Sequence, residues 1–76
     1  MKVIGNFLVV TQVFGDTTEE KQALVNIDDI QFIGEGKDEK GLHGYIYCSQ
    51  RPPIVVKESV EEIANTLENE YFNEEY

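Results

Sequence analysis

Residues 7–14 carry the strongest structural signal in the chain, and they read Phe7-Leu8-Val9-Val10-Thr11-Gln12-Val13-Phe14. β-Branched and aromatic residues dominate this stretch, which predicts a β-strand. Successive side chains of a strand point to opposite faces, and here both faces are largely apolar. Such a strand is typical of the middle of a sheet that is covered on both sides. We therefore expect residues 7–14 to form a central strand.

Four further strands are predicted along the chain by the same criteria, at residues 22–26, 30–35, 45–49 and 54–57. The polar residues 15–21 are expected to form a hairpin loop. Residues 26–29, Asn-Ile-Asp-Asp, suit a tight corner because Asn and Asp side chains can bond their own backbone. In the fourth strand, Tyr45 and Tyr47 share one face and Ile46 and Cys48 share the other.

Glycine and proline set two further expectations. Residues 34–44 contain four glycines and five charged residues, which predicts an exposed, mobile loop. Pro52 and Pro53 cannot donate backbone hydrogen bonds to a neighbouring strand, so the strand that follows them is expected at an edge of the sheet.

A C-terminal helix is predicted to begin after Ser59. The run Ser59-Val60-Glu61-Glu62 matches a capping box, in which the serine and the second glutamate satisfy each other's backbone amides. An apolar stripe at helical spacing follows, formed by Val60, Ile63, Ala64, Leu67 and Tyr71. The packed helix is expected to end at residues 71–73. Phe72 falls on the polar side, and we expect it either to fold back with Tyr76 onto the sheet or to contact a partner.

These elements predict a single α+β domain over residues 1–76, with a five-stranded antiparallel sheet followed by one C-terminal α-helix. One helix can cover one face of such a sheet but not both. The remaining apolar residues must be buried in another way, either by curling of the sheet into a barrel or by packing against a second copy of the chain. Small chains often gain stability by oligomerising, so we expect a barrel-like sheet or a homodimer.

Charge is unevenly distributed along the chain. Fifteen acids and six bases give a net charge of −9, and residues 58–76 hold seven acids and no base. An acidic surface repels phosphate, which argues against direct binding to nucleic acid or to anionic membranes. The longest apolar run is four residues, too short for membrane insertion, and no secretory leader is recognised, so a cytoplasmic protein is expected. The acidic segment predicts either a solvated helix face or a surface complementary to a basic partner.

Groups with chemical reactivity are scarce. His43 and Cys48 are the only imidazole and thiol, and their spacing of five places them on opposite faces of a regular strand. A nucleophile and its base must lie within hydrogen-bonding reach, so this pair does not predict catalysis. A single His and a single Cys also argue against a transition-metal site. We expect no enzyme activity, no metal and no cofactor.

Three stretches resemble the small flagellar FlbD family: Val-Thr-Gln-Val-Phe-Gly at residues 10–15, Leu-Val-Asn-Ile-Asp-Asp-Ile-Gln-Phe-Ile at 24–33 and Ile-Val-Val-Lys-Glu-Ser-Val-Glu-Glu-Ile at 54–63. The similarity covers residues 9–67 and implies short strands with a C-terminal helix. It also implies a small cytoplasmic accessory protein linked to flagellar function. The chain departs from the family in its extra acids around residues 19–21, in residues 34–53 and in its acidic, aromatic tail.

The residues therefore predict a small protein–protein interaction or adaptor module that associates with itself and with an unidentified protein. Its candidate contacts are the strand at residues 54–57 and four aromatic side chains, Tyr45, Tyr47, Phe72 and Tyr76. One alternative is a phage-type acidic inhibitor that mimics nucleic acid and binds a basic host protein through Glu61, Glu62 and Glu68. A flagellar accessory role is the other alternative.

Overall fold

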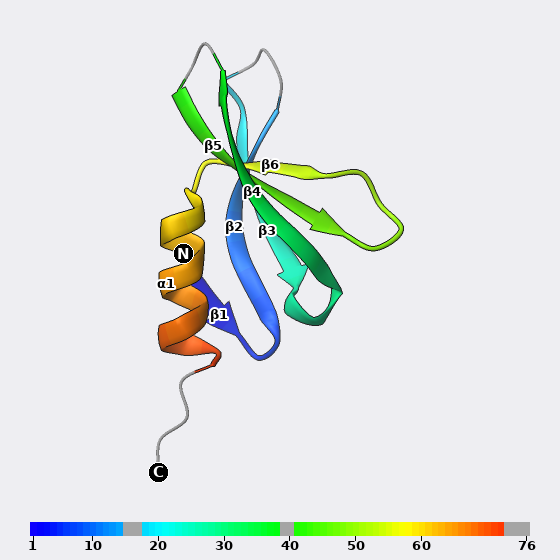
Figure 1. Ribbon diagram of the computed structural model, residues 1–76, viewed down its shortest axis with the longest axis vertical. Coiled ribbons are helices and arrows are strands. Elements are labelled where there is room, and N and C mark those ends of the chain that lie inside the picture. Colours follow the sequence, from blue (N-terminus) through cyan, green and yellow to red (C-terminus); the bar gives the residue numbers. More distant parts are fainter. Residues whose placement is uncertain (15–17, 39–40, 73–76) are drawn as a thin grey trace.

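The computed structural model describes residues 1–14, 18–38 and 41–72 of the protein, with only the backbone of Asp38 included. Six strands, a 3₁₀ turn and one helix make up an α+β fold (Figure 1). The elements are β1 (Lys2–Ile4), β2 (Phe7–Val13), β3 (Glu20–Asn26), η1 (Ile27–Asp29), β4 (Ile30–Asp38), β5 (Gly41–Cys48), β6 (Ile54–Val56) and α1 (Val60–Glu70). The predicted fold class is thus confirmed, with six strands in place of five.

The strands form one open antiparallel sheet. Its order is β1-β2-β6-β5-β4, and β3 pairs with β2. Because β3 occupies one edge of β2 over its whole length, β1 and β6 share the other edge, with β1 opposite residues 7–9 and β6 opposite Gln12. The first strand of the prediction is therefore central, as expected. The sheet does not close into the barrel that was one of two expectations.

Both halves of the sheet contribute to a single hydrophobic core. The buried side chains come from β2 and β3, from η1, from β5 and β6, and from α1: Leu8, Val10, Val25, Ile27, Ile46, Cys48, Val56 and Ile63. We call the side of the sheet that carries these residues the core face and the opposite side the outer face. The helix packs against the core face, next to β1 and β4 (Figure 1). It does not pack on the outer face, where Val9 is buried and Phe7 and Leu24 are exposed.

Three predictions about the strands are wrong. Residues 34–44 do not form a loop, because β4 continues to Asp38 and β5 begins at Gly41. Strand β6 is not at an edge: it pairs with β5 and also with Gln12 of β2. Residues 2–4 form β1, which was not predicted, and the expected hairpin loop ends earlier because β3 starts at Glu20.

The helix begins as predicted and is fixed to the sheet at both ends. The Ser59 side chain accepts a hydrogen bond from the Glu62 amide at 3.1 Å, and Glu35 Oε1 of β4 accepts one from the Val60 amide at 3.1 Å. At the other end, Glu70 Oε1 accepts from the Val3 amide of β1 at 3.0 Å. Of the predicted stripe, Ala64 is exposed rather than packed. This helix is too short and too polar to cross a membrane, and the described residues contain no other α-helix.

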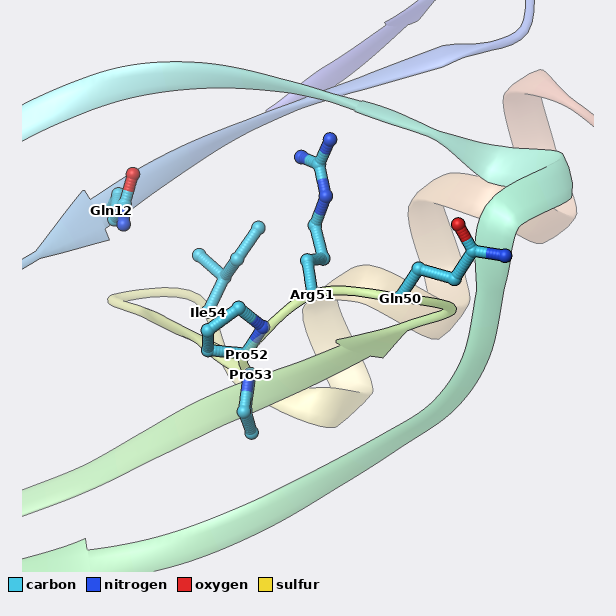
Figure 2. Close-up of a pocket in the computed structure, with 6 residues that line it drawn as sticks. All are labelled: Gln12, Gln50, Arg51, Pro52, Pro53 and Ile54. Carbon is cyan, nitrogen blue, oxygen red and sulfur yellow. The ribbon is translucent and has the colours of Figure 1, made fainter.

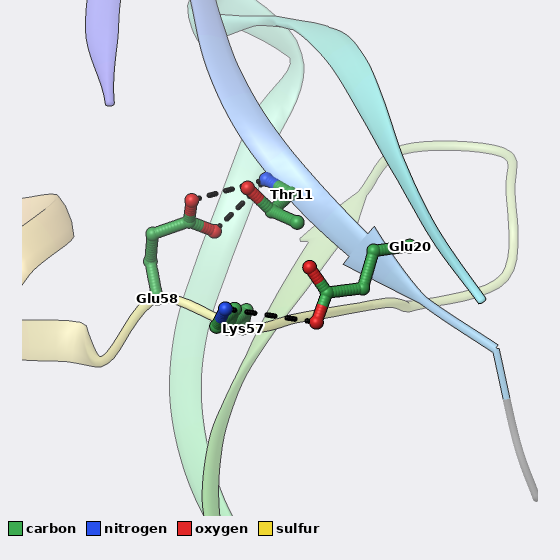
Figure 3. A network of polar contacts seen from close by, with 4 residues as sticks. All are labelled: Thr11, Glu20, Lys57 and Glu58. Atoms are coloured by element: carbon green, nitrogen blue, oxygen red, sulfur yellow. Dashed lines mark hydrogen bonds and ion pairs between the residues drawn. The ribbon is translucent and has the colours of Figure 1, made fainter. Parts of the chain in front are cut away.

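A buried carboxylate extends the short pairing of β2 with β6 (Figure 3). Both carboxylate oxygens of Glu58 accept from the Thr11 amide, at 2.9 and 3.1 Å. The Lys57 amide donates to the Thr11 carbonyl at 2.8 Å, and the Lys57 ammonium lies 3.6 Å from a Glu20 carboxylate oxygen. Together these contacts fasten the segment that leads from β6 into α1.

Candidate functional site

The outer face of β4 and β5 carries three aromatic side chains, Phe32, Tyr45 and Tyr47, which we call the aromatic surface. Ile46 and Cys48 of β5 are buried in the core, so the tyrosines that alternate with them point to the outer face. This confirms the prediction that Tyr45 and Tyr47 share one face.

A β-bulge brings Phe32 to the same face. Ile30 lies opposite Cys48 and Phe32 opposite Tyr47, so Gln31 is an extra residue in β4. In a regular strand Ile30 and Phe32 would share a face. The bulge instead turns Ile30 toward the core and leaves Phe32 on the outer face. The apolar spacing at residues 30, 32 and 33 breaks strict alternation, and this was the signal in the sequence that could have revealed Phe32.

The three rings lie close to the backbone of the hairpin and remain accessible. The centroids of Phe32 and Tyr47 are 5.3 Å apart in an edge-to-face arrangement, and the side chains are 60% and 38% exposed. The Phe32 ring lies over Gly34, and the Tyr45 ring lies over Gly36. The glycines of this segment therefore sit in a paired strand beneath aromatic rings, a known way to compensate for glycine in a sheet.

The aromatic surface and the acidic helix are on different sides of the sheet. Glu61, Glu62 and Glu68 are exposed on α1, which packs on the core face. The structure thus does not join these three acids with the tyrosines into one site. Phe72 follows the helix, 62% exposed, with its ring 4.9 Å from that of Tyr71. Tyr76 lies outside the described residues.

A second feature is an open depression between β2 and the turn that joins β5 to β6 (Figure 2). It has a volume of about 530 Å³ and is lined by Gln12, Gln50, Arg51, Pro52, Pro53 and Ile54. Gln50 has a φ of 64°, a left-handed conformation that residues other than glycine rarely adopt. Sequence reasoning missed this depression because Gln12 joins the other five residues only through the pairing of β2 with β6.

The thiol and the imidazole do not form a reactive pair. The extra residue of the β-bulge is in β4, so β5 keeps its regular alternation, and His43 and Cys48 lie on opposite faces. Burial raises the pKa of the Cys48 thiol, and the Asp29 carboxylate raises it further, while Arg51 opposes the rise. The thiol is therefore held in its unreactive, protonated form. Within the described ranges, no three His, Cys, Asp or Glu side chains are grouped to hold a metal ion.

Comparison of the chain with models of protein families, with curated proteins and with solved structures finds no match in any of the three.

Proposed function

We propose that the chain is a small, non-enzymatic protein–protein interaction module that associates with itself and binds a partner protein through the aromatic surface. The observation that carries this proposal is the exposure of Phe32 and Tyr47 on a well-paired hairpin. Aromatic side chains are enriched in protein interfaces because they offer a large, rigid apolar area at a low cost in conformational entropy.

Self-association is supported by the coverage of the sheet. The single helix packs on the core face, and large apolar side chains remain exposed on the outer face of both halves: Ile4, Phe7, Leu24, Phe32 and Tyr47. These residues form two groups, with Phe7 opposite Ile4 in one and Phe32 opposite Tyr47 in the other. Exposed apolar groups of this kind often mark an interaction site. A second copy of the chain would remove such groups from water.

Partner binding is tested by affinity capture from native lysate followed by titration of the captured protein. We expect the wild type to retain a partner and the double variant Phe32→Ala/Tyr47→Ala to lose it. Leu42→Ala is the matched control, because Leu42 is 53% exposed on the same hairpin but lies on the opposite face from Tyr45 and Tyr47. Equal affinity for the wild type and the double variant would contradict the assignment of the aromatic surface.

Self-association is tested by sedimentation of the wild type over a dilution series. The expected result is a weight-average mass that rises with concentration and falls when the outer-face apolar residues are replaced, as in Phe7→Ser/Leu24→Ser or Phe32→Ser/Tyr47→Ser. A wild-type chain that stays monomeric at every concentration would rule out this part of the proposal.

An acidic inhibitor of a basic protein is the second candidate, and it rests on the helix. Residues 60–72 contain no basic residue, and Glu61, Glu62 and Glu68 are exposed along α1. Binding of this kind depends on charge, so replacing all three by Lys should abolish capture of a basic partner. Retention of that partner by the triple variant would exclude this role. A flagellar accessory role remains a prediction from resemblance alone.

A further inference from the structure

The turn that joins β5 to β6, which lines the depression, lies on the side of the molecule away from α1 (Figure 1). The sheet is open, and the helix fills the space beside β1 and β4. On the opposite side, the depression lies between β2 and the β5–β6 turn, and Figure 2 shows its six lining residues. The depression has a volume of about 530 Å³ and is open to solvent.

Arg51 is the charged group of this depression. Its side chain extends from the turn and lines the depression together with Gln12 of β2 (Figure 2). Among the described residues, its guanidinium makes neither a hydrogen bond nor an ion pair. A guanidinium offers five donors in a planar fork that matches a carboxylate. Arg51 is exposed, so its donors face solvent and not a protein acceptor in the described part of the chain.

The remaining lining residues favour an anion that carries an apolar group. Gln12 and Gln50 add carboxamide donors, and Pro52, Pro53 and Ile54 supply an apolar wall. None of the six is acidic, and residues 49–57 contain no acid in a chain that has fifteen. The nearby Asp29 carboxylate accepts a hydrogen bond from the Ser49 hydroxyl at 2.9 Å and does not line the depression.

The backbone of the turn between β5 and β6 is conformationally restricted. Two consecutive prolines restrict the backbone before β6, and Gln50 is held at a positive φ. Residues in sparsely populated backbone conformations cluster at binding sites, where the surrounding structure enforces them. The backbone on both sides of Arg51 is therefore restricted, by Gln50 before it and by the two prolines after it.

We propose that the depression binds a carboxylate attached to a short apolar group, with Arg51 as the anchor for the carboxylate and the Pro52–Ile54 wall as the contact for the apolar group. Such a group occurs in small organic acids and at the C-terminus of a peptide that ends in an aliphatic residue. The site is separate from the aromatic surface, so it does not depend on the proposed function.

The site is tested by amide chemical shifts of the full chain during titration with butyrate, and with butyramide as the neutral control. We expect saturable shifts at Gln12 and at residues 50–54 with butyrate and none with butyramide. Arg51→Gln should weaken butyrate binding by at least about tenfold, since hydrogen bonds to charged groups are the stronger ones. Lys2→Gln removes the same charge from β1 and should leave the affinity unchanged.

A second arm separates the two sources of the carboxylate. Acetyl-Ala-Val with a free C-terminus is compared with its C-terminal amide and with butyrate. Tighter binding of the peptide acid than of butyrate would assign the site to peptide C-termini, and equal binding would assign it to small acids. Absence of saturable shifts with both acids, equal shifts with the neutral amides, or an unchanged affinity in Arg51→Gln would overturn the proposal.

Discussion

Glu58 is a buried carboxylate that connects the segment before α1 to the backbone of β2. Both of its oxygens accept from the Thr11 amide, on the edge of β2 where the pairing with β6 has ended because β6 stops at Val56. Glu58→Ala leaves this amide without its acceptor, and we expect a loss of about 1–3 kcal/mol in the free energy of unfolding, measured with urea. Glu61→Ala, at an exposed helix position, should change it by less than about 0.5 kcal/mol. Equal effects of the two substitutions would show that the Glu58 contact contributes nothing.

Cys48 is expected to react slowly in the folded protein. Its side chain is buried, and that burial raises the pKa of the thiol, so the reactive thiolate is scarce at neutral pH. The rate of reaction with a disulfide reagent should be much lower in buffer than in denaturant, and it should keep rising with pH beyond the usual thiol pKa. A native rate equal to the denatured rate would contradict the buried position of Cys48 on the core face.

At the scale of elements, position 44 of β5 needs a glycine because the segment that leads from β6 into α1 passes close to it. A β-carbon on Gly44 would lie 2.5 Å from the Glu58 carbonyl oxygen, a backbone atom that cannot move aside freely. On Gly34 it would lie 2.8 Å from Phe32 Cε1, the far end of an exposed ring that can rotate away. We therefore expect Gly44→Ala to destabilise the fold by about 1–3 kcal/mol, and Gly34→Ala to cost less or to stabilise. Urea denaturation of both variants measures the difference, and a larger loss for Gly34→Ala would contradict it.

Some elements could be predicted from sequence patterns alone, and others could not. Residues 7–14 and the Ser59 capping box were recognised because their signals are local: apolar alternation in the first and a side chain bonding a nearby amide in the second. Residues 34–44 were misassigned because the rings over Gly34 and Gly36 come from Phe32 and Tyr45, and a glycine-rich sequence does not show which rings cover it. Strand β6 was placed at an edge because its pairing with Gln12 is a tertiary contact.

Only part of the candidate site could be predicted from the sequence, because its other residues are brought together by contacts that are not local in the chain. Tyr45 and Tyr47 follow from alternation within one strand, whereas Phe32 joins them through the bulge at Gln31. Arg51 is one of the six bases of the chain, and its local sequence does not distinguish it from the others. Its depression exists because Gln12 of β2 and the turn after β5 meet across the open side of the sheet, and no periodicity in either segment encodes that meeting.

For the whole molecule, the contact of Tyr71 with Asp28 joins the end of the helix to the turn between the two halves of the sheet. The Tyr71 hydroxyl donates to Asp28 Oδ1 at 3.2 Å. Burial raises the pKa of Tyr71 above its usual 10.0, and the charge and hydrogen bond of Asp28 raise it further. A folded-state pKa above the unfolded one stabilises the fold below about pH 10, and this contribution is lost as the pH rises through the folded value.

Tyr71→Phe removes that contribution. The difference in melting temperature between the wild type and Tyr71→Phe should be constant at neutral pH and should shrink as the pH rises above about 10. Thermal melts of both proteins over a pH series measure it. Tyr71→Phe with the same alkaline profile as the wild type would show that the hydroxyl and Asp28 are not coupled.

Because the chain is strongly acidic, salt should have opposite effects on self-association through the outer face and on binding of a basic protein to α1. Two copies that each carry −9 repel one another, while the outer-face patches that would bring them together are apolar. Salt screens this repulsion, so raising the NaCl concentration should strengthen self-association. Binding of a basic protein to α1 should instead weaken, because salt screens the attraction between the basic protein and the acidic helix.

Sedimentation at low and high salt measures the effect on self-association. The variant Glu61→Gln/Glu68→Gln lowers the repulsion between copies and should therefore reduce the salt dependence of self-association. Self-association that weakened with salt would mean that opposite charges, and not the apolar residues of the outer face, hold the copies together.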